Sequence, residues 1–522
     1  MFILNLIIFI LVLGAIILIH ELGHFFFAKR AGILCHEFSI GMGPAIYQKR
    51  KGETIYSIRS IPIGGYVSMA GESINDALIK TDQIIGININ EQGQIYQIIM
   101  NQELSSDAVG IVKDFDLYGK DFDPLFIELE IDGVLMNYPA LRDTVYRFSE
   151  KKEMWITPSE KSFESKTLWQ RFLVIFAGPM MNFLLALVLF LIVGFFVFKP
   201  NLESNVIDSV SSGSSAETIG LLSSDQITNI NGQTIQDWND LSEAMKTLDT
   251  TTISLSYSRL GIVTVIDNID IAVIIQMAGI ANINDNQEIY TNQAIIGQAF
   301  GRAETDGGLK SGDLITKMTV DSFEYDIAGW DDIVHFFRIN TRGEITISYE
   351  RDEIVGQATY VMISDSALEK LGYQPMIFQL GIAPLSEFNL GYTLVYPFRA
   401  FYSNMMQVFN TIGLLFDASE DIGIGDLSGP VGIFSMVSNT ASQGIIALIG
   451  FTAFLSINIG LLNLLPIPAL DGGRLIFLGV EAIIRKPLNR RFENTVNNVM
   501  FILLLTLFVF VTYNDIIRLI KG

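Results

Sequence analysis

The stretch Ile16-Ile17-Leu18-Ile19-His20-Glu21-Leu22-Gly23-His24 joins an apolar run to a cluster of ionisable side chains. Residues four positions apart lie on one face of a helix, so His20 and His24 can bind the same metal ion. The H-E-x-x-H spacing is typical of zinc sites in which the glutamate takes a proton from the attacking water, and it predicts that role for Glu21. The alternative is a pair of histidines that cap a helix end and pair with Glu21.

The apolar run in front of this motif predicts a membrane span. Residues 2–19 contain one polar residue, Asn5, and about 20 apolar residues are needed to cross the hydrocarbon core. A cleavable signal peptide is the alternative, but no Lys or Arg precedes the run and no A-x-A-like site follows it. Ionisable groups at membrane depth are costly and usually functional. The motif therefore indicates chemistry at the end of a span.

The composition of the 522 residues supports a membrane protein. Half of them are hydrophobic and 17% are charged, against about 25% in soluble domains. The formal net charge of −22 argues against nucleic-acid binding, which needs a basic face. Cys35 is the one cysteine, so internal disulfides and zinc sites built from several cysteines are excluded. The four histidines leave few candidates for a His-based metal site.

Hydropathy predicts about four transmembrane helices, and charge orients them. The four segments are residues 1–28, 171–198, 445–473 and 495–516, and the span within the third segment is expected at about 445–465. Lys and Arg residues follow the first span, precede the second and fill the loop before the fourth, which places 28–171 and 471–494 in the cytoplasm. The stretch 199–444 has 11 basic and 31 acidic residues, a net charge of −20, and is predicted to lie outside.

A fifth apolar stretch, residues 390–416, could also span. It contains Arg399, Pro397 and several amides, and its aromatic residues cluster at one end. This pattern is more typical of an amphipathic helix at the membrane interface.

Asp471 is the candidate for a third metal ligand, because a catalytic zinc has three protein ligands and one open position. It follows 44 uncharged residues and stands in the run Asn463-Leu464-Leu465-Pro466-Ile467-Pro468-Ala469-Leu470-Asp471-Gly472-Gly473. A helix-stop signal is the alternative reading of that run. If 390–416 does not span, the first and third spans run in the same direction, and their ends can bring Asp471 to the histidines.

The outer region contains an internal repeat. Residues 220–228 parallel 308–316, and residues 238–241 parallel 330–333, which suggests two small tandem domains at 200–290 and 291–385. Both copies resemble PDZ domains, although Ser224 stands where a turn glycine is usual. On the cytoplasmic side, 29–71 is predicted to form a β-hairpin region, and 72–165 a mixed, β-rich insert without a chemical motif.

Both chemical motifs are similar to those of the site-2 protease family of intramembrane zinc metalloproteases. The resemblance is closest to the bacterial branch with tandem PDZ domains, of the regulator-of-sigma-E protease type. It covers nearly the whole chain except about 72–165, which is longer than is usual in that branch. Three further runs match: Gly64-Gly65-Tyr66-Val67, Ala177-Gly178-Pro179-Met180-Met181-Asn182 and Ser428-Gly429-Pro430-Val431-Gly432.

The resemblance implies the roles of individual residues. His20, His24 and Asp471 would bind Zn²⁺, and Glu21 would be the general base. Asn458 and Asn463 would contact substrate, with ordinary interhelical hydrogen bonding as the alternative. Residues 41–69 would form a membrane-associated hairpin that pairs with an unwound substrate, with a plain cytoplasmic hairpin as the alternative.

We therefore expect a multi-pass α-helical membrane protein with a cytoplasmic β-hairpin and insert and two extracytoplasmic PDZ-like α+β domains. It would reside in the plasma membrane with its active site towards the cytoplasm. Its expected activity is hydrolysis of peptide bonds within or beside transmembrane segments, with anti-sigma factors or remnant signal peptides as substrates by resemblance. A non-catalytic PDZ scaffold is disfavoured by the intact motifs. An ion or metal transporter is disfavoured because the spans are otherwise uncharged.

Overall fold

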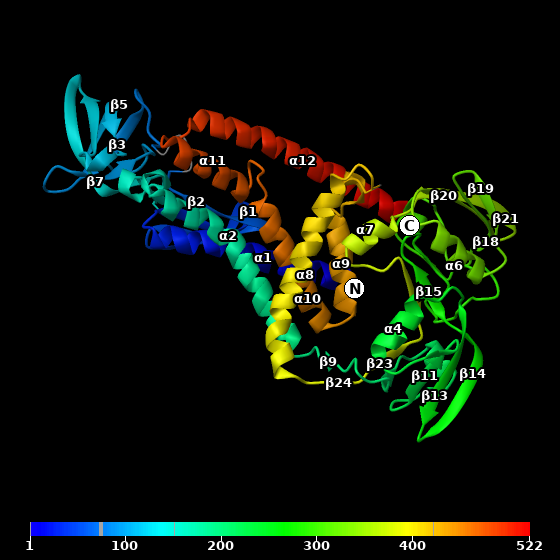
Figure 1. Cartoon of the computed structure of the whole chain (residues 1–522). Coiled ribbons are helices and arrows are strands. Elements are labelled where there is room, and N and C mark those ends of the chain that lie inside the picture. Colours follow the sequence, from blue (N-terminus) through cyan, green and yellow to red (C-terminus); the bar gives the residue numbers. More distant parts are fainter. Residues whose placement is uncertain (1, 72–76, 151, 421, 522) are drawn as a thin grey trace. The chain divides into compact units, whose positions relative to one another are not determined.

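The computed structural model describes residues 2–71, 77–150, 152–420 and 422–521. It divides into two compact units (Figure 1). The first comprises Met1–Leu189 and Met436–Thr506, and the second comprises Phe190–Ser435 and Leu507–Gly522.

Four helices of the described chain are long and apolar enough to cross a membrane, as the hydropathy predicted. They are α1 (Phe2–Arg30), α2 (Leu168–Gly194), α10 (Ile445–Leu464) and α12 (Arg490–Lys521). The amphipathic stretch forms α8 (Leu390–Leu415), which does not reach the hydropathy of a span. The remaining helices near the C-terminus are α9 (Pro430–Ser442) and α11 (Asp471–Ile484).

The predicted segment 445–473 contains a span close to the expected 445–465 and the start of a second helix. Helix α10 ends at Leu464, and Asp471 is the first residue of a separate helix, α11. Pro466 and Pro468 cannot donate a backbone N–H, so the helix cannot continue through them. Gly472 and Gly473 let the turn fold back, because a Cβ on either would lie within 2.4 Å of a carbonyl oxygen in 464–467. The carboxylate of Asp471 therefore stands at a helix N-terminus, which favours negative charge.

The predicted hairpin is present as β1 (Cys35–Lys51) and β2 (Thr54–Met69), paired antiparallel with several register shifts. Its base packs against the ends of α1 and α2 through one apolar cluster: Ala28, Ile33, Cys35, Phe38, Val67, Met69 and Val174. Further along, Ile46 and Ile58 are exposed.

The insert forms a small sheet domain with its own core, as its β-rich prediction requires. Its strands are β3 (Ile84–Ile89), β4 (Ile95–Ile99), β5 (Ala108–Asp116), β6 (Phe126–Ile131), β7 (Val134–Arg147) and β8 (Glu153–Trp155). A parallel pairing of β4 with β7 closes the antiparallel order β4-β3-β5-β6-β7 into a barrel.

The internal repeat is visible as two sheets of matching order, β12-β11-β13-β14 and β19-β18-β20-β21 (Figure 1). The first repeat contains β10 (Ile207–Val210), α3 (Ser215–Thr218), β11 (Gln226–Ile230), β12 (Gln233–Thr234), α4 (Trp238–Lys246), β13 (Thr252–Arg259) and β14 (Ile262–Asp270). The second contains β17 (Gln298–Ala299), α5 (Arg302–Thr305), β18 (Leu314–Val320), β19 (Phe323–Asp326), α6 (Trp330–Ile339), β20 (Glu344–Arg351) and β21 (Ile354–Val361).

Strands that follow each repeat in the chain connect the repeats, so the sheets do not divide at the predicted boundary between 290 and 291. Strand β10 pairs with β23 (Ile382–Pro384), which follows the second repeat in the chain. Strands β15 (Ala272–Ile275) and β16 (Ile280–Ala281) pair with β22 (Met376–Gln379) and β17, respectively. One hydrophobic cluster runs through both repeats, and the second repeat lies in the chain between β10 and its partner β23.

Candidate metal centre

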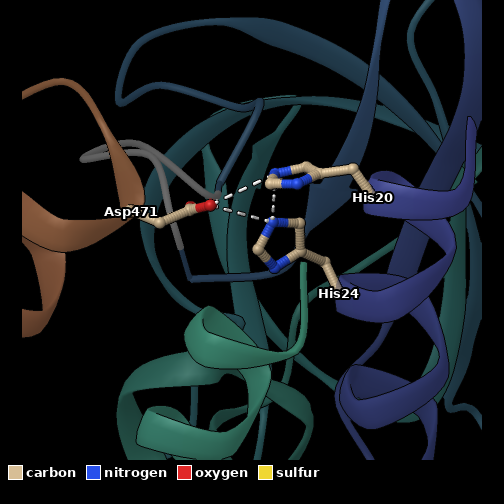
Figure 2. A group of neighbouring side chains, drawn as sticks. All are labelled: His20, His24 and Asp471. Atoms are coloured by element: carbon tan, nitrogen blue, oxygen red, sulfur yellow. Dashed lines mark hydrogen bonds and ion pairs between the residues drawn. The ribbon is translucent and has the colours of Figure 1, made fainter. Parts of the chain in front are cut away.

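Helix α1 places His20 and His24 on one face, where they project towards Asp471 at the start of α11 (Figure 2). Both histidines are 8% exposed. The basic residues Lys29 and Arg30 follow in the last turn of the same helix. The structure thus brings together three residues that the sequence separates by some 450 positions.

The three facing atoms form a nearly equilateral triangle. His20 Nε2 lies 3.2 Å from His24 Nε2, and Asp471 Oδ2 lies 3.2 Å and 3.4 Å from these two nitrogens. Ligands about 2.05 Å from a tetrahedral zinc ion are separated by about 3.3 Å, so the triangle fits such an ion. Asp471 Oδ2 is also buried without a hydrogen bond of acceptable geometry among the described residues. A cation would satisfy this oxygen and both nitrogens together.

Helix α2 packs unusually closely on the two histidines because of glycines. A Cβ at Gly178 would lie 2.2 Å from His24 Nε2 and 2.9 Å from His20 Cε1. A Cβ at Gly23 would lie 2.4 Å from the carbonyl oxygen of Ala177. Both positions therefore exclude any larger side chain. Gly178 belongs to the run 177–182 that resembles the family, and no pattern in the sequence predicts its contact with the histidines.

A cavity of about 270 Å³ adjoins the triangle. Its lining includes the three triangle residues and Glu21, together with Tyr66, Val67, Met69, Ile175, Asn463, Ala469, Leu470 and Arg474. The end of β2 passes close to Glu21, since a Cβ at Gly65 would lie 3.3 Å from Glu21 Cγ. The cavity offers a polar space, large enough for several waters, that is bordered by an extended strand.

The two predicted asparagines take different places. Asn463 lines the cavity, and its amide donates to Ile459 O at 3.0 Å. Asn458 is not among the lining residues, and its amide donates to Phe454 O at 2.8 Å within the same helix. Contact with substrate stays a prediction for both.

A polar network in the hairpin holds Tyr66 beside the cavity. Glu37 accepts hydrogen bonds from Ser57, from Arg59 at 2.7 Å and from the Tyr66 hydroxyl at 2.8 Å. Burial alone would raise the pKa of Glu37, but these three donors outweigh it and keep the carboxyl ionised to lower pH than usual. Burial and the Glu37 carboxylate together raise the pKa of Tyr66 to about 12. Tyr66 therefore remains a neutral hydrogen-bonding wall of the site.

Comparison with known proteins identifies the family to which the chain belongs. The model of peptidase family M50 matches residues 8–507. The chain belongs to peptidase family M50, the site-2 protease family. It is similar to the regulator of sigma-W protease RasP of Bacillus subtilis (strain 168), with 31% identity over 520 residues, which cover 99% of this chain and 100% of that protein.

Two further relatives cover almost the whole chain. The zinc metalloprotease RasP of Shouchella clausii (strain KSM-K16) is 30% identical over 515 residues, 98% of both chains. The zinc metalloprotease RasP of Geobacillus kaustophilus (strain HTA426) is 29% identical over 514 residues, 97% of this chain and 96% of that protein. The M50 chain described here is therefore a zinc metalloprotease of the membrane, with Zn²⁺ as its cofactor.

Proposed function

We propose that this M50 protease hydrolyses peptide bonds within or next to transmembrane segments of other membrane proteins. The observation that carries the proposal is the triangle of His20, His24 and Asp471 at the end of an apolar helix, beside a cavity lined by a β-strand. A protease of soluble substrates has no need for ligands on a membrane-spanning helix, where ionisable groups are costly.

Each residue of the proposed site has one task. His20, His24 and Asp471 would hold Zn²⁺, which when bound supplies a Lewis acid for the scissile carbonyl. Glu21 would take the proton from the attacking water and deliver it to the leaving amine. Glu21 lines the same cavity as all three proposed ligands. Asn463, also in the lining, would donate a hydrogen bond to the substrate backbone.

The hairpin would supply the extended backbone that hydrolysis requires. A transmembrane helix hides its carbonyls in internal hydrogen bonds, so the substrate must unwind before it is cut. Tyr66, Val67 and Met69 of β2 border the cavity, and β1 and β2 form a sheet of two strands. An unwound segment could add to this sheet and run past Glu21.

Charge supports the proposed orientation, and the name of a relative supports the proposed substrate class. The basic residues around 28–171 and 471–494 favour a cytoplasmic active site, and the acidic stretch 199–444 favours an external position. Because a relative is named as a regulator of sigma-W, a membrane-bound anti-sigma factor is the substrate class that we propose first. Remnant signal peptides are the second.

The test uses Glu21→Gln as a catalytically inactive variant. The purified full-length protein and this variant are incubated in vesicles with a single-span substrate, and the products are mapped by mass spectrometry. The wild type should cut within or beside the span. Glu21→Gln should keep about one zinc per chain and lose at least about 10²-fold in rate, the lower range for a lost general base.

A second experiment tests the proposed role of the hairpin in cleavage. Ile58 pairs with Ile40 and Tyr47, and Ile58→Pro removes a backbone donor from β2. This variant should bind zinc normally and cut a single-span substrate more slowly, while Ile58→Val should match the wild type. Cleavage confined to soluble loops far from the span would overturn the proposed function.

A further inference from the structure

Asn182 on α2 is a fully buried carboxamide in a helix that is otherwise apolar along most of its length. Burying an amide without partners costs several kcal/mol in an apolar medium. Its Nδ2 lies 3.3 Å from His20 Nδ1, and its Oδ1 has no hydrogen-bond partner among the described residues. Within the described chain, the directed contact of this side chain is therefore with a proposed zinc ligand.

The contact bears on which nitrogen of His20 carries the proton. A neutral imidazole has one N–H, and the nitrogen that binds a metal must be without it. His20 Nε2 points into the triangle with His24 and Asp471. The proton of His20 must then reside on Nδ1, and Nδ1–H needs an acceptor.

His24 meets the same requirement with a backbone acceptor. Its Nδ1 lies 2.8 Å from the carbonyl oxygen of Val174, also on α2. A carbonyl oxygen can only accept, so His24 carries its proton on Nδ1 and leaves Nε2 free for the ion. Helix α2 thus contacts Nδ1 of both histidines. It contacts His24 through the backbone carbonyl of Val174 and His20 through the side chain of Asn182.

The oxygen and nitrogen of a carboxamide occupy nearly the same positions, so hydrogen-bond chemistry decides which of them faces His20. Oδ1 can accept the proton of Nδ1, whereas Nδ2 can only donate. We infer that Asn182 turns its carboxamide oxygen to His20 Nδ1–H and is a positioning residue that fixes this histidine in the tautomer that binds Zn²⁺. The inference rests on the ligand set proposed above.

The structure offers a matched control at the backbone of the same residue. Ser456 on α10 is fully buried, and its hydroxyl donates to the main-chain carbonyl of Asn182 at 2.8 Å. This bond joins α2 to α10 through the backbone and does not involve the carboxamide. Ser456→Ala therefore changes packing around Asn182 without changing the partner of His20.

The experiment measures zinc affinity of the purified full-length protein by competition with a chromophoric chelator. Asn182→Leu keeps the size of the side chain and removes its acceptor, and it should weaken zinc binding about 10–100-fold. Asn182→Asp still accepts from Nδ1–H, so its affinity should stay within about threefold of the wild type or exceed it. Ser456→Ala should bind zinc like the wild type.

Two outcomes would overturn the inference. Wild-type affinity in Asn182→Leu would show that the carboxamide does not act on His20, and a loss in Asn182→Asp as large as in Asn182→Leu would show that an acceptor is not what His20 requires. If Asn182→Leu fails to fold, the affinity of Asn182→Asp decides alone. The variant His20→Ala distinguishes a failure of the proposed ligand set from a failure of the inference about Asn182. Normal zinc binding in His20→Ala would overturn the ligand set itself.

Discussion

Buried polar side chains serve opposite purposes in the helical region around α1, α2, α10 and α11 and in the sheet region of the two repeats. In the repeats, Asp225 and Asp313 are buried and fully paired. Arg259 contacts both oxygens of Asp225 at 2.7 Å, and Arg351 contacts those of Asp313 at 2.6 and 2.7 Å. Each aspartate also accepts a backbone N–H, from Leu222 or Lys310.

The helical region contains a buried polar cluster that the protein leaves incomplete. Asp471 Oδ2 and two imidazole nitrogens face one another, and no protein donor of good geometry reaches that oxygen within the described residues. A cluster that the protein completes is structural, whereas a cluster that only an ion can complete is a site. The comparison therefore supports the proposed metal site in the helices and a structural role for the paired aspartates of the sheets.

The largest expected effect comes from removing one aspartate in each region. Asp471→Ala should lose zinc and reduce proteolysis by more than about 10³-fold, because a Lewis acid contributes several kcal/mol to catalysis. Asp313→Ala should keep zinc and the rate of cleavage of a short, single-span substrate. It should instead destabilise the second repeat by about 2–3 kcal/mol, less than a wholly buried pair, since Arg351 is 33% exposed.

Zinc content by elemental analysis and hydrogen exchange at the amides of α4 and α6 would measure both effects in the full-length protein. Normal zinc and activity in Asp471→Ala would break the comparison. So would loss of zinc in Asp313→Ala.

The second prediction removes the sheet region altogether. The repeats could act as a steric gate, which would block substrates whose outer domain is still attached. A chain without residues 205–384 should then cut trimmed substrates, whose outer domain has already been removed, at the wild-type rate. It should also cut untrimmed substrates, which still carry that domain. The deletion has to extend to 384, because β23 would otherwise lose its partner β10. Quantitative cleavage assays with both substrates decide. Slower cleavage of trimmed substrates by a zinc-loaded deletion variant would instead support capture of the substrate by the repeats.

The third prediction concerns the dependence of the first repeat on pH. Arg259, which hydrogen-bonds to Asp225, holds the pKa of Asp225 below its ordinary value, although burial opposes this. A carboxyl whose pKa is lower in the folded state stabilises the fold above its unfolded pKa of about 3.9, and this contribution is lost as the pH falls. Asp225→Asn should be less stable than the wild type at pH 7, and the difference should shrink towards pH 3.

Hydrogen exchange at α4 amides at several pH values would follow this loss, with α6 amides as the internal control. A difference that grew on acidification would contradict the pairing of Asp225 with Arg259.

The sequence predicted the two regions unequally. Local spacing places His20 and His24 on one face, and hydropathy identifies α1, α2, α10 and α12, because these features depend on neighbours in the chain. The end of α10 at Leu464 also agrees with the predicted span of about 445–465, whereas the separate helix α11, which begins at Asp471 after two prolines, was not predicted.

Apart from the approach of Asp471 to the two histidines, contacts between distant segments were not predicted from the sequence. Asn182 meets His20 across 162 residues, and β10 meets β23 on the far side of the second repeat. No periodicity in one segment encodes which face of another it will meet. The signal for Asn182 in the sequence was a polar residue in an apolar helix. Such a residue indicates a buried polar contact but does not identify the partner.

The smallest expected effect concerns one turn residue that differs between the two repeats. Ser224 adopts a φ of 75° at the position where the second repeat has Gly312 with a φ of 93°. A left-handed conformation costs a non-glycine residue about 1–2 kcal/mol. Glycine avoids this cost, but its greater freedom in the unfolded chain offsets part of the gain in folding stability. Ser224→Gly should therefore stabilise the first repeat by up to about 1 kcal/mol, and Gly312→Ser should destabilise the second by a similar amount. Hydrogen exchange at α4 and α6 in the full-length variants would show each change in its own repeat. Zinc binding should not respond to either substitution, and a shift in zinc affinity would mean that the sheets and the metal centre are coupled after all.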